Sequence, residues 1–165
     1  MTAKTLGYGA AAGSAALLLA AFVFQLLGYA PCTMCIWQRY PHAVAIVAGV
    51  LLAFGFAPIL MLTLGALSAA ATSGLGLFHT GVERDWWDGP AACSGSGLDL
   101  NAMSIDDLLP STATEVPRLV MCDEVVWEFL TLSMASWNAI WSAVLAVVWI
   151  WALVTALGRS AGSRA

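Results

Sequence analysis

Three long stretches without a charged side chain restrict what this chain can fold into. Asp, Glu, Lys and Arg are all absent from residues 5–38, 40–82 and 129–158. A helix needs about 20 apolar residues to cross a bilayer, so the middle stretch is long enough for two crossings. Gly55 and Pro58 lie near its centre and predict a tight turn there. The sequence therefore predicts four membrane-spanning helices.

The predicted fold is an all-α integral membrane protein, a four-helix transmembrane bundle with one long loop between the third and fourth helices. We expect a single domain of residues 1–165, with spans at about 8–29, 41–56, 58–79 and 136–157 and the loop at about 80–135. The composition agrees, because 61% of residues are hydrophobic, 10% are charged and the mean hydropathy is +0.85. The first apolar run exceeds the ~7 to 15 residues of a signal-peptide core, so we expect this helix to be retained.

Charge alone does not orient the bundle. Four spans put both chain ends on one side of the membrane, and the two sides carry equal numbers of basic side chains. The terminal side has Lys4, Arg159 and Arg164, and the loop side has Arg39, Arg84 and Arg118. All ten acidic residues fall between Glu83 and Glu128, so the isoelectric point near 4.8 reflects one loop and not an acidic surface throughout.

Other residues have roles that are ordinary for membrane proteins. We expect most tryptophans to be interfacial anchors, on the loop side Trp37, Trp86, Trp87, Trp127, Trp137 and Trp141, and in the other half Trp149 and Trp151. Small residues could allow close helix approach, or simply reflect membrane composition: Gly7, Gly9, Gly13, Ser14, Gly65, Ser68, Ser73, Gly74 and Gly76. In the loop, Ser104 and Asp107 resemble a helix start, although a surface turn explains them equally well.

The chain has four cysteines, and the predicted topology puts all of them on one side of the membrane. Four cysteines permit three pairings, of which Cys32 with Cys35 and Cys93 with Cys122 is the natural one. On a helix, residues three apart have neighbouring side chains, within reach of a disulfide. The cysteines therefore form two candidate pairs on the same face.

Three kinds of chemistry are open to these cysteines. A zinc site would need two further ligands, and Cys93 and Cys122 are too widely spaced to form a second CxxC motif. Two inert disulfides would stabilise an exported loop. However, the ring closed by a CxxC disulfide is too small to remove much chain entropy. Such a bond is better suited to opening and closing, so we favour a redox role.

The residues around the CxxC motif, in the sequence CTMCIWQR, favour a reactive thiolate. A thiolate at the amino end of a helix is stabilised by the helix dipole, and a nearby cation lowers its pKa further. Arg39 is four residues after Cys35, so it would share a helical face with that sulfur, although it could also be a snorkelling interfacial residue. Pro41 biases the preceding residue away from helix and predicts a break before the second span. His79 ends the third predicted helix at the same membrane face, either as a structural residue or as a hydrogen-bonding partner for an acceptor.

These features together resemble the disulfide bond formation protein B (DsbB) family of bacterial inner-membrane thiol oxidases. CTMCIWQR is similar to that family's CxxCxxxR motif, and His79-Thr80 to its His-Thr pair. Cys93 and Cys122 match its second cysteine pair, and residues 127–134 (WEFLTLSM) match its WxFLxLxM entry to the fourth helix. The sequence departs from the family in three respects. Gln38 stands where some members carry an acid, Pro41 interrupts the start of the second span, and the terminal tail is short with few basic residues.

The resemblance implies a relay of disulfide exchange. The DsbB family is itself a standard example of a system that keeps the bacterial periplasm oxidising. A reduced DsbA-like periplasmic protein of the thioredoxin fold would attack the Cys93–Cys122 disulfide at Cys93. Cys122 would then attack Cys32, and Cys35 would pass the electrons to a membrane quinone.

The resemblance also implies the surroundings of that reaction. Arg39 and His79 would line the quinone pocket, with Arg39 stabilising the Cys35 thiolate. Ubiquinone is favoured over menaquinone, although no residue distinguishes them. The expected partners are the DsbA-like protein, the quinone and the lipid bilayer, with no metal and no nucleic acid. Because stable disulfide exchange belongs in an oxidising compartment, the cysteine face would be periplasmic and both termini cytoplasmic, in the inner membrane.

Two alternatives to this function stay open at the level of sequence. A disulfide-stapled membrane scaffold or assembly subunit would use the same cysteines without turnover. A reductase would run the electrons in the opposite direction, but the absence of cysteines within the spans argues against an electron path through the bilayer. Bound quinone would separate these alternatives from a thiol oxidase.

Overall fold

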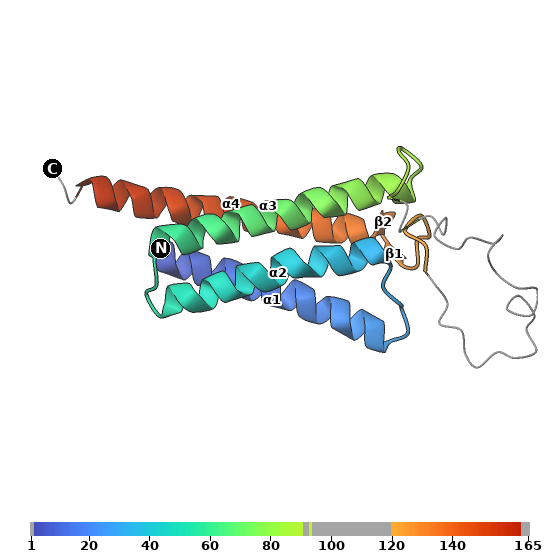
Figure 1. Cartoon of the computed structure of the whole chain (residues 1–165), viewed down its shortest axis with the longest axis horizontal. Coiled ribbons are helices and arrows are strands. Elements are labelled where there is room, and N and C mark those ends of the chain that lie inside the picture. The colour runs from blue at the N-terminus through green and yellow to red at the C-terminus, as the bar shows by residue number, and fades with distance from the viewer. Residues whose placement is uncertain (1, 91–92, 94–119, 163–165) are drawn as a thin grey trace, which may run out of the picture.

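The structure is a computed structural model, and it describes residues 2–90, 93 and 120–162. These residues form four helices and one small hairpin (Figure 1). The helices are α1 (Ala3–Leu26), α2 (Thr33–Ala53), α3 (Pro58–Glu83) and α4 (Met134–Gly162). Within the described part of the chain, all four are long and apolar enough to cross a membrane. The predicted four-helix transmembrane bundle is confirmed.

The helices run side by side, and the two chain ends lie at the same end of the bundle (Figure 1). The α1–α2 connection lies at the opposite end, together with the end of α3 and the start of α4. We call these the terminal end and the cysteine end of the bundle. The turn between α2 and α3 is the predicted tight one: Gly55 has φ of 75°, Ala57 has φ of 35°, and Pro58 begins α3.

Helix α2 starts earlier than predicted. It begins at Thr33, with Cys32 as its N-cap, and continues through Pro41 without a break. The predicted break at Pro41 is therefore wrong. A proline removes one backbone hydrogen bond, and membrane helices tolerate this where neighbouring groups and local adjustments compensate. As a result, the CxxC motif forms the first turn of a transmembrane helix.

A short antiparallel hairpin precedes α4, which the sequence did not predict. Strand β1 (Glu128–Phe129) pairs with β2 (Leu132–Ser133), with Glu128 opposite Ser133 and Phe129 opposite Leu132. The Arg84 guanidinium at the end of α3 donates a hydrogen bond to the Thr131 carbonyl at 3.0 Å. The hairpin is therefore attached to α3 at the cysteine end.

The terminal half of the bundle is closely packed around Trp149. This indole has no exposed surface and packs with Leu52 and Leu62, so the prediction that Trp149 is an interfacial anchor is wrong. A Cβ atom at Gly65 would lie 2.6 Å from the indole, whereas one at Gly74 would meet nothing within 4 Å. Close helix approach therefore explains Gly65 but not Gly74. The Ser104 and Asp107 interpretation lies outside the described residues.

Candidate thiol-disulfide site

Cys32 and Cys35 are free thiols at the start of α2. The Sγ atom of Cys32 caps the helix by accepting a hydrogen bond from the Cys35 backbone N–H at 3.2 Å. The two sulfurs are 3.0 Å apart and share a hydrogen bond. The predicted proximity of this pair is confirmed, and the structure describes it in the dithiol state.

Cys93 and Cys122 form a disulfide, as the predicted pairing requires, with 5.1 Å between their Cα atoms. The bond joins residues 29 apart in the sequence, from beyond α3 to shortly before β1. Both cysteines are buried, with 4% and 1% of their surface exposed. The loop pair is therefore covered by the protein.

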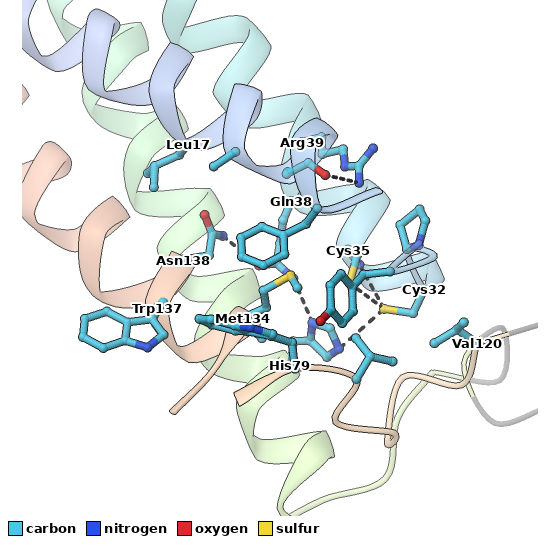
Figure 2. Close-up of a pocket in the computed structure, with 18 of the residues that line it drawn as sticks. Leu17, Cys32, Cys35, Gln38, Arg39, His79, Val120, Met134, Trp137 and Asn138 are labelled. Carbon is cyan, nitrogen blue, oxygen red and sulfur yellow. Dashed lines mark hydrogen bonds between the residues drawn. The ribbon is translucent and has the colours of Figure 1, made fainter. Parts of the chain in front are cut away.

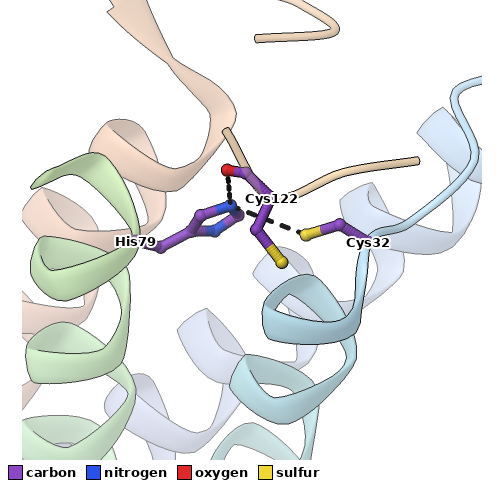
Figure 3. A group of neighbouring side chains, drawn as sticks. All are labelled: Cys32, His79 and Cys122. Carbon is purple, nitrogen blue, oxygen red and sulfur yellow. Dashed lines mark hydrogen bonds between the residues drawn. The ribbon is translucent and has the colours of Figure 1, made fainter. Parts of the chain in front are cut away.

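The two cysteine pairs meet at His79, near the end of α3 (Figure 3). The Nε2 atom of His79 lies 3.5 Å from Cys32 Sγ and 3.2 Å from the Cys122 carbonyl oxygen. The three atoms Cys32 Sγ, His79 Nε2 and Cys122 Sγ all lie within 4.8 Å of one another. One sulfur of each pair is thus held beside the same imidazole.

The environment of Cys32 favours its thiolate. The hydrogen bond with the Cys35 thiol, assisted by the imidazole of His79 and the Cys35 backbone N–H, lowers the pKa of the Cys32 thiol to about 4, although burial opposes the change. At neutral pH a reduced Cys32 is therefore a thiolate. The sequence assigned the stabilised thiolate to Cys35, whereas this geometry favours Cys32.

The same three side chains are close enough to hold a metal ion by distance alone. A metal would need Cys122 as a thiolate, but its sulfur is bonded to Cys93. It would also need a lone pair on His79 Nε2. Gln38 Nε2 lies 3.0 Å from His79 Nδ1 and uses the lone pair of Nδ1, so the proton of the neutral imidazole is on Nε2. The donor set fits thiol-disulfide exchange better than metal binding.

A cavity of about 380 Å³ opens beside the CxxC pair (Figure 2). Its walls come from α1, the start of α2, the end of α3, the hairpin and the start of α4, and they are mainly apolar. The polar and sulfur-bearing side chains among them include Cys32, Cys35, Gln38, Arg39, His42, His79, Glu83 and Asn138. Volumes of this order are typical of small-molecule sites.

Arg39 lies in the wall of this cavity, with its guanidinium against α1 (Figure 2). It donates hydrogen bonds to Gln25 Oε1 at 2.7 Å and to the Ala21 carbonyl at 3.4 Å, and it lies over the Phe22 ring. Its Nε atom is buried and has no hydrogen-bond partner among the residues that the structure describes. Within that part of the chain, Arg39 therefore retains one N–H donor that is not satisfied.

Sequence reasoning missed several polar residues behind the cysteines. Gln38 was noted only as a departure from the family, and Asn138 and Thr72 were not singled out. Asn138 Nδ2 donates to Gln38 Oε1 at 2.7 Å, and Thr72 Oγ1 donates to the Gln38 carbonyl at 3.1 Å. A signal was present in the sequence, because polar side chains inside membrane helices are costly and are commonly functional.

Glu83 closes the site on the side of the hairpin. Its Oε1 lies 3.9 Å from His79 Nε2, and its Oε2 accepts a hydrogen bond from Ser133. His79 and Glu83 are four residues apart on α3, so they share one helix face. The hairpin thus helps to position an acidic group next to the imidazole.

Comparison with known proteins agrees with this cysteine geometry. The family model described as Disulfide bond formation protein DsbB matches residues 3–152. The chain belongs to the DsbB family. It is 30% identical over 144 residues to Disulfide bond formation protein B of Shewanella frigidimarina, an alignment covering 84% of this chain and 83% of that protein.

Two further DsbB relatives align over most of their length. Identity is 31% over 164 residues with the protein of Shewanella amazonensis, covering 94% of each chain. It is 32% over 166 residues with that of Xanthomonas oryzae pv. oryzae, covering 90% of this chain and 85% of the relative. No solved structure gives a significant match. The protein is therefore a disulfide-forming membrane oxidoreductase of the DsbB family, and its four apolar helices fit a multi-pass protein of the inner membrane.

Proposed function

We propose that this protein reoxidises a DsbA-like periplasmic dithiol protein and passes the electrons through its two cysteine pairs to a membrane quinone. The observation that carries this proposal is that the sulfurs of Cys122 and Cys32 lie together beside His79, with these sulfurs and the His79 nitrogen within 4.8 Å of one another (Figure 3). Sulfurs of an inert pair of disulfides need no such proximity. A relay needs it, because the second exchange is an attack of one pair on the other.

Each step of the proposed relay is a balanced two-electron exchange. A partner thiolate attacks Cys93 Sγ, and the Cys93–Cys122 bond breaks with Cys122 as the leaving thiolate. With the CxxC pair oxidised, Cys122 attacks Cys32 and releases Cys35 as a thiolate. The second thiol of the partner then attacks the partner sulfur that is bonded to Cys93. This completes the partner's disulfide and releases Cys93 as a thiolate. Collapse of the Cys32–Cys122 bond by Cys93 then restores the loop disulfide and leaves Cys32 and Cys35 reduced.

The described state has an oxidised loop pair and a reduced CxxC pair. In the proposed relay this is the state in which the electrons are ready to leave. Cys32 and Cys35 re-form their bond while two electrons pass from Cys35 to the quinone, which becomes a quinol by taking up the proton of the Cys35 thiol and one proton from the solvent. The low pKa of the Cys32 thiol, about 4, means that Cys32 is already deprotonated when this bond forms.

The cavity supports a quinone as the acceptor. It touches Cys35 and is lined by apolar and aromatic side chains suited to a lipid-soluble ring. The buried Nε–H of Arg39 has no partner in residues 2–90, 93 and 120–162, and a quinone carbonyl oxygen would satisfy it. We therefore propose Arg39 and His79 as quinone-pocket residues, with Arg39 acting through its free N–H.

Redox energetics explain why such an acceptor is needed. A DsbA-type partner lies near −120 mV, roughly 80 mV above a glutathione pool near −200 mV, and this gap is about 3.7 kcal/mol for two electrons. Glutathione disulfide therefore cannot reoxidise that partner efficiently. This function requires the cysteine end to face the periplasm and the terminal end to face the cytoplasm.

The test uses purified protein in detergent, reduced DsbA and a soluble ubiquinone analogue. We expect bound quinone in the preparation, quinone-dependent oxidation of DsbA, and a visible absorbance change in Cys32→Ala as the thiol chemistry at Cys35 is altered. Ser73→Ala is the matched control, because Ser73 Oγ donates to the Ala139 carbonyl away from the cysteines. A protein that retains both disulfides but shows no quinone-dependent turnover would be a stapled scaffold, and the proposal would be wrong.

A further inference from the structure

A row of buried hydrogen bonds leads from the middle of the bundle to His79. Gln38 Nε2 lies 3.0 Å from His79 Nδ1 and 3.2 Å from the Met34 carbonyl oxygen. On the other side, Gln38 Oε1 accepts a hydrogen bond from Asn138 Nδ2 at 2.7 Å. Gln38 has only 5% of its surface exposed. The amide therefore has a defined partner on each of its faces.

These partners fix which way the amide points and hence where His79 carries its proton. The Met34 carbonyl oxygen can only accept, so the amide nitrogen must face it. That nitrogen also faces His79 Nδ1, which must then be the acceptor. The single proton of a neutral imidazole is left on Nε2, and the Nε2–H faces Cys32 Sγ and the Cys122 carbonyl.

The far end of the row is held at one ring nitrogen of His42, whose Nδ1 is buried and has no hydrogen-bond partner among the described residues. His42 Nε2 donates to Asn138 Oδ1 at 3.0 Å, and Asn138 Nδ2 has Thr72 Oγ1 as a further neighbour at 3.3 Å. His42 and Thr72 are buried, with 3% and 0% exposed surface. Because water is scarce at this depth, a broken bond in the row leaves a polar group unpaired at substantial cost. The donors therefore all point in one direction, from His42 toward the cysteines.

We propose that Gln38, Asn138 and His42 form a positioning chain that holds His79 as its Nε2–H tautomer, with this N–H directed at Cys32 Sγ. The inference deepens the proposed function, because it assigns positioning residues to the cysteine site of the same relay. His79 then stabilises the Cys32 thiolate each time the CxxC bond opens. Its ring keeps its orientation, since Nδ1 is held by an amide that has no other favourable arrangement.

The charged or titratable groups near the His79 ring are Glu83, 3.9 Å from Nε2, and the thiols of Cys32 and Cys35. His79 Nδ1, by contrast, faces the uncharged amide of Gln38. Replacing Gln38 by another uncharged residue therefore removes a hydrogen bond from the ring without removing a charge from its surroundings.

The test measures the thiolate of Cys32 directly and needs neither partner nor quinone. It uses reduced protein carrying Cys93→Ala and Cys122→Ala, in which Cys32 and Cys35 are the remaining cysteines. Iodoacetamide alkylation of Cys32 is followed by peptide mass spectrometry across a series of pH values. We expect the pH midpoint of Cys32 alkylation to lie well below that of an ordinary thiol.

Gln38→Met keeps the side-chain length but removes the donor to Nδ1, so the alkylation midpoint should rise by about one pH unit, a tenfold change. Asn138→Ala should raise it by a smaller amount, because the amide of Gln38 loses its own orienting donor. Ser73→Ala removes a hydrogen bond between α3 and α4 that is not part of the positioning chain, so it should leave the alkylation midpoint unchanged.

An unchanged midpoint in folded Gln38→Met, or an equal shift in Ser73→Ala, would overturn the positioning chain. If Gln38→Met fails to accumulate, an unchanged midpoint in Asn138→Ala overturns it instead. Failure of the proposed function has a different signature: wild-type protein would not transfer electrons to quinone, while the alkylation midpoints would still report on His79.

Discussion

The two ends of the bundle are built from the same four helices but are packed in opposite ways. At the terminal end, Trp149 fills the space left by Gly65 and is fully buried. At the cysteine end, the helices leave a cavity of about 380 Å³ beside Cys35, with buried polar groups around it. The comparison indicates that one end supplies stability and the other supplies chemistry. Substitutions should therefore separate these two properties.

The largest effect is expected at the loop disulfide. Cys122→Ala removes the thiol that carries electrons onward but leaves Cys93 able to exchange with a partner. Turnover should cease, and a non-reducing gel should show a partner-linked band that dithiothreitol abolishes. The matched variant Cys93→Ala should show much less of this band. Equal trapping by both variants, or trapping by Cys93→Ala alone, would reverse the assigned roles.

The second prediction concerns the terminal end. Gly65→Ala would place a methyl group 2.6 Å from the buried indole of Trp149. Overpacking of this kind should lower the free energy of unfolding by about 1 to 3 kcal/mol. Thermal or denaturant unfolding in detergent would measure it, with Gly74→Ala as the control because its Cβ would meet no atom within 4 Å.

The same pair of glycine variants sharpens the comparison of the two ends. Turnover per folded molecule should be unchanged in Gly65→Ala, since the substitution lies outside the cysteine cavity. A specific loss of turnover without a loss of stability would show that the terminal end also contributes to the chemistry.

A smaller effect is expected at the cavity wall. Arg39→Ala removes the unpartnered Nε–H and should raise the apparent quinone KM about tenfold, because losing a hydrogen bond from a charged donor weakens binding by about that factor. Partner trapping should be retained. Arg159→Ala is the control, since Arg159 lies in the last turn of α4, at the terminal end of the bundle. Steady-state turnover against quinone concentration decides, and an unchanged KM with an unchanged kcat would remove Arg39 from the mechanism.

The smallest predicted effect is that of His79→Ala. Loss of the Nε2–H beside Cys32 should slow quinone reduction several-fold, without changing the thiol content of Cys93 and Cys122. The measurements are single-turnover quinone reduction and thiol counting in the same preparation. If activity falls only in proportion to the amount of protein in the membrane, His79 has a packing role and no chemical one.

The sequence was most informative where one residue type decides the outcome. The absence of charge predicted four spans, and Gly55 with Pro58 predicted the turn between α2 and α3. The break predicted at Pro41 was wrong. The residue before a proline generally disfavours helix, but this preference is outweighed in the apolar surroundings of a membrane helix, and α2 remains continuous. Trp149 misled for a related reason, since the same indole suits an interface or a core.

The cysteine end of the bundle was predictable in part. The cysteines, Arg39 and His79 could be chosen from motif and spacing, but the partners of His79 could not. Gln38 and Asn138 are 100 residues apart in the sequence, and their contact exists only because α2 and α4 pack together. The direction of Arg39 toward α1 likewise depends on the placement of Gln25. Both are consequences of helix packing, which a single sequence does not encode as a local pattern.

The close approach of Gly65 to Trp149 has an evolutionary consequence. Neither position can change freely, because a larger residue at 65 has no room while the indole is present, and a smaller residue at 149 leaves a void while glycine is present. Compensated substitutions should therefore be inherited as pairs. An alignment of many family members should show covariation between these two positions, with alanine or serine at 65 accompanied by a smaller apolar side chain at 149, and Gly74 should vary independently of both.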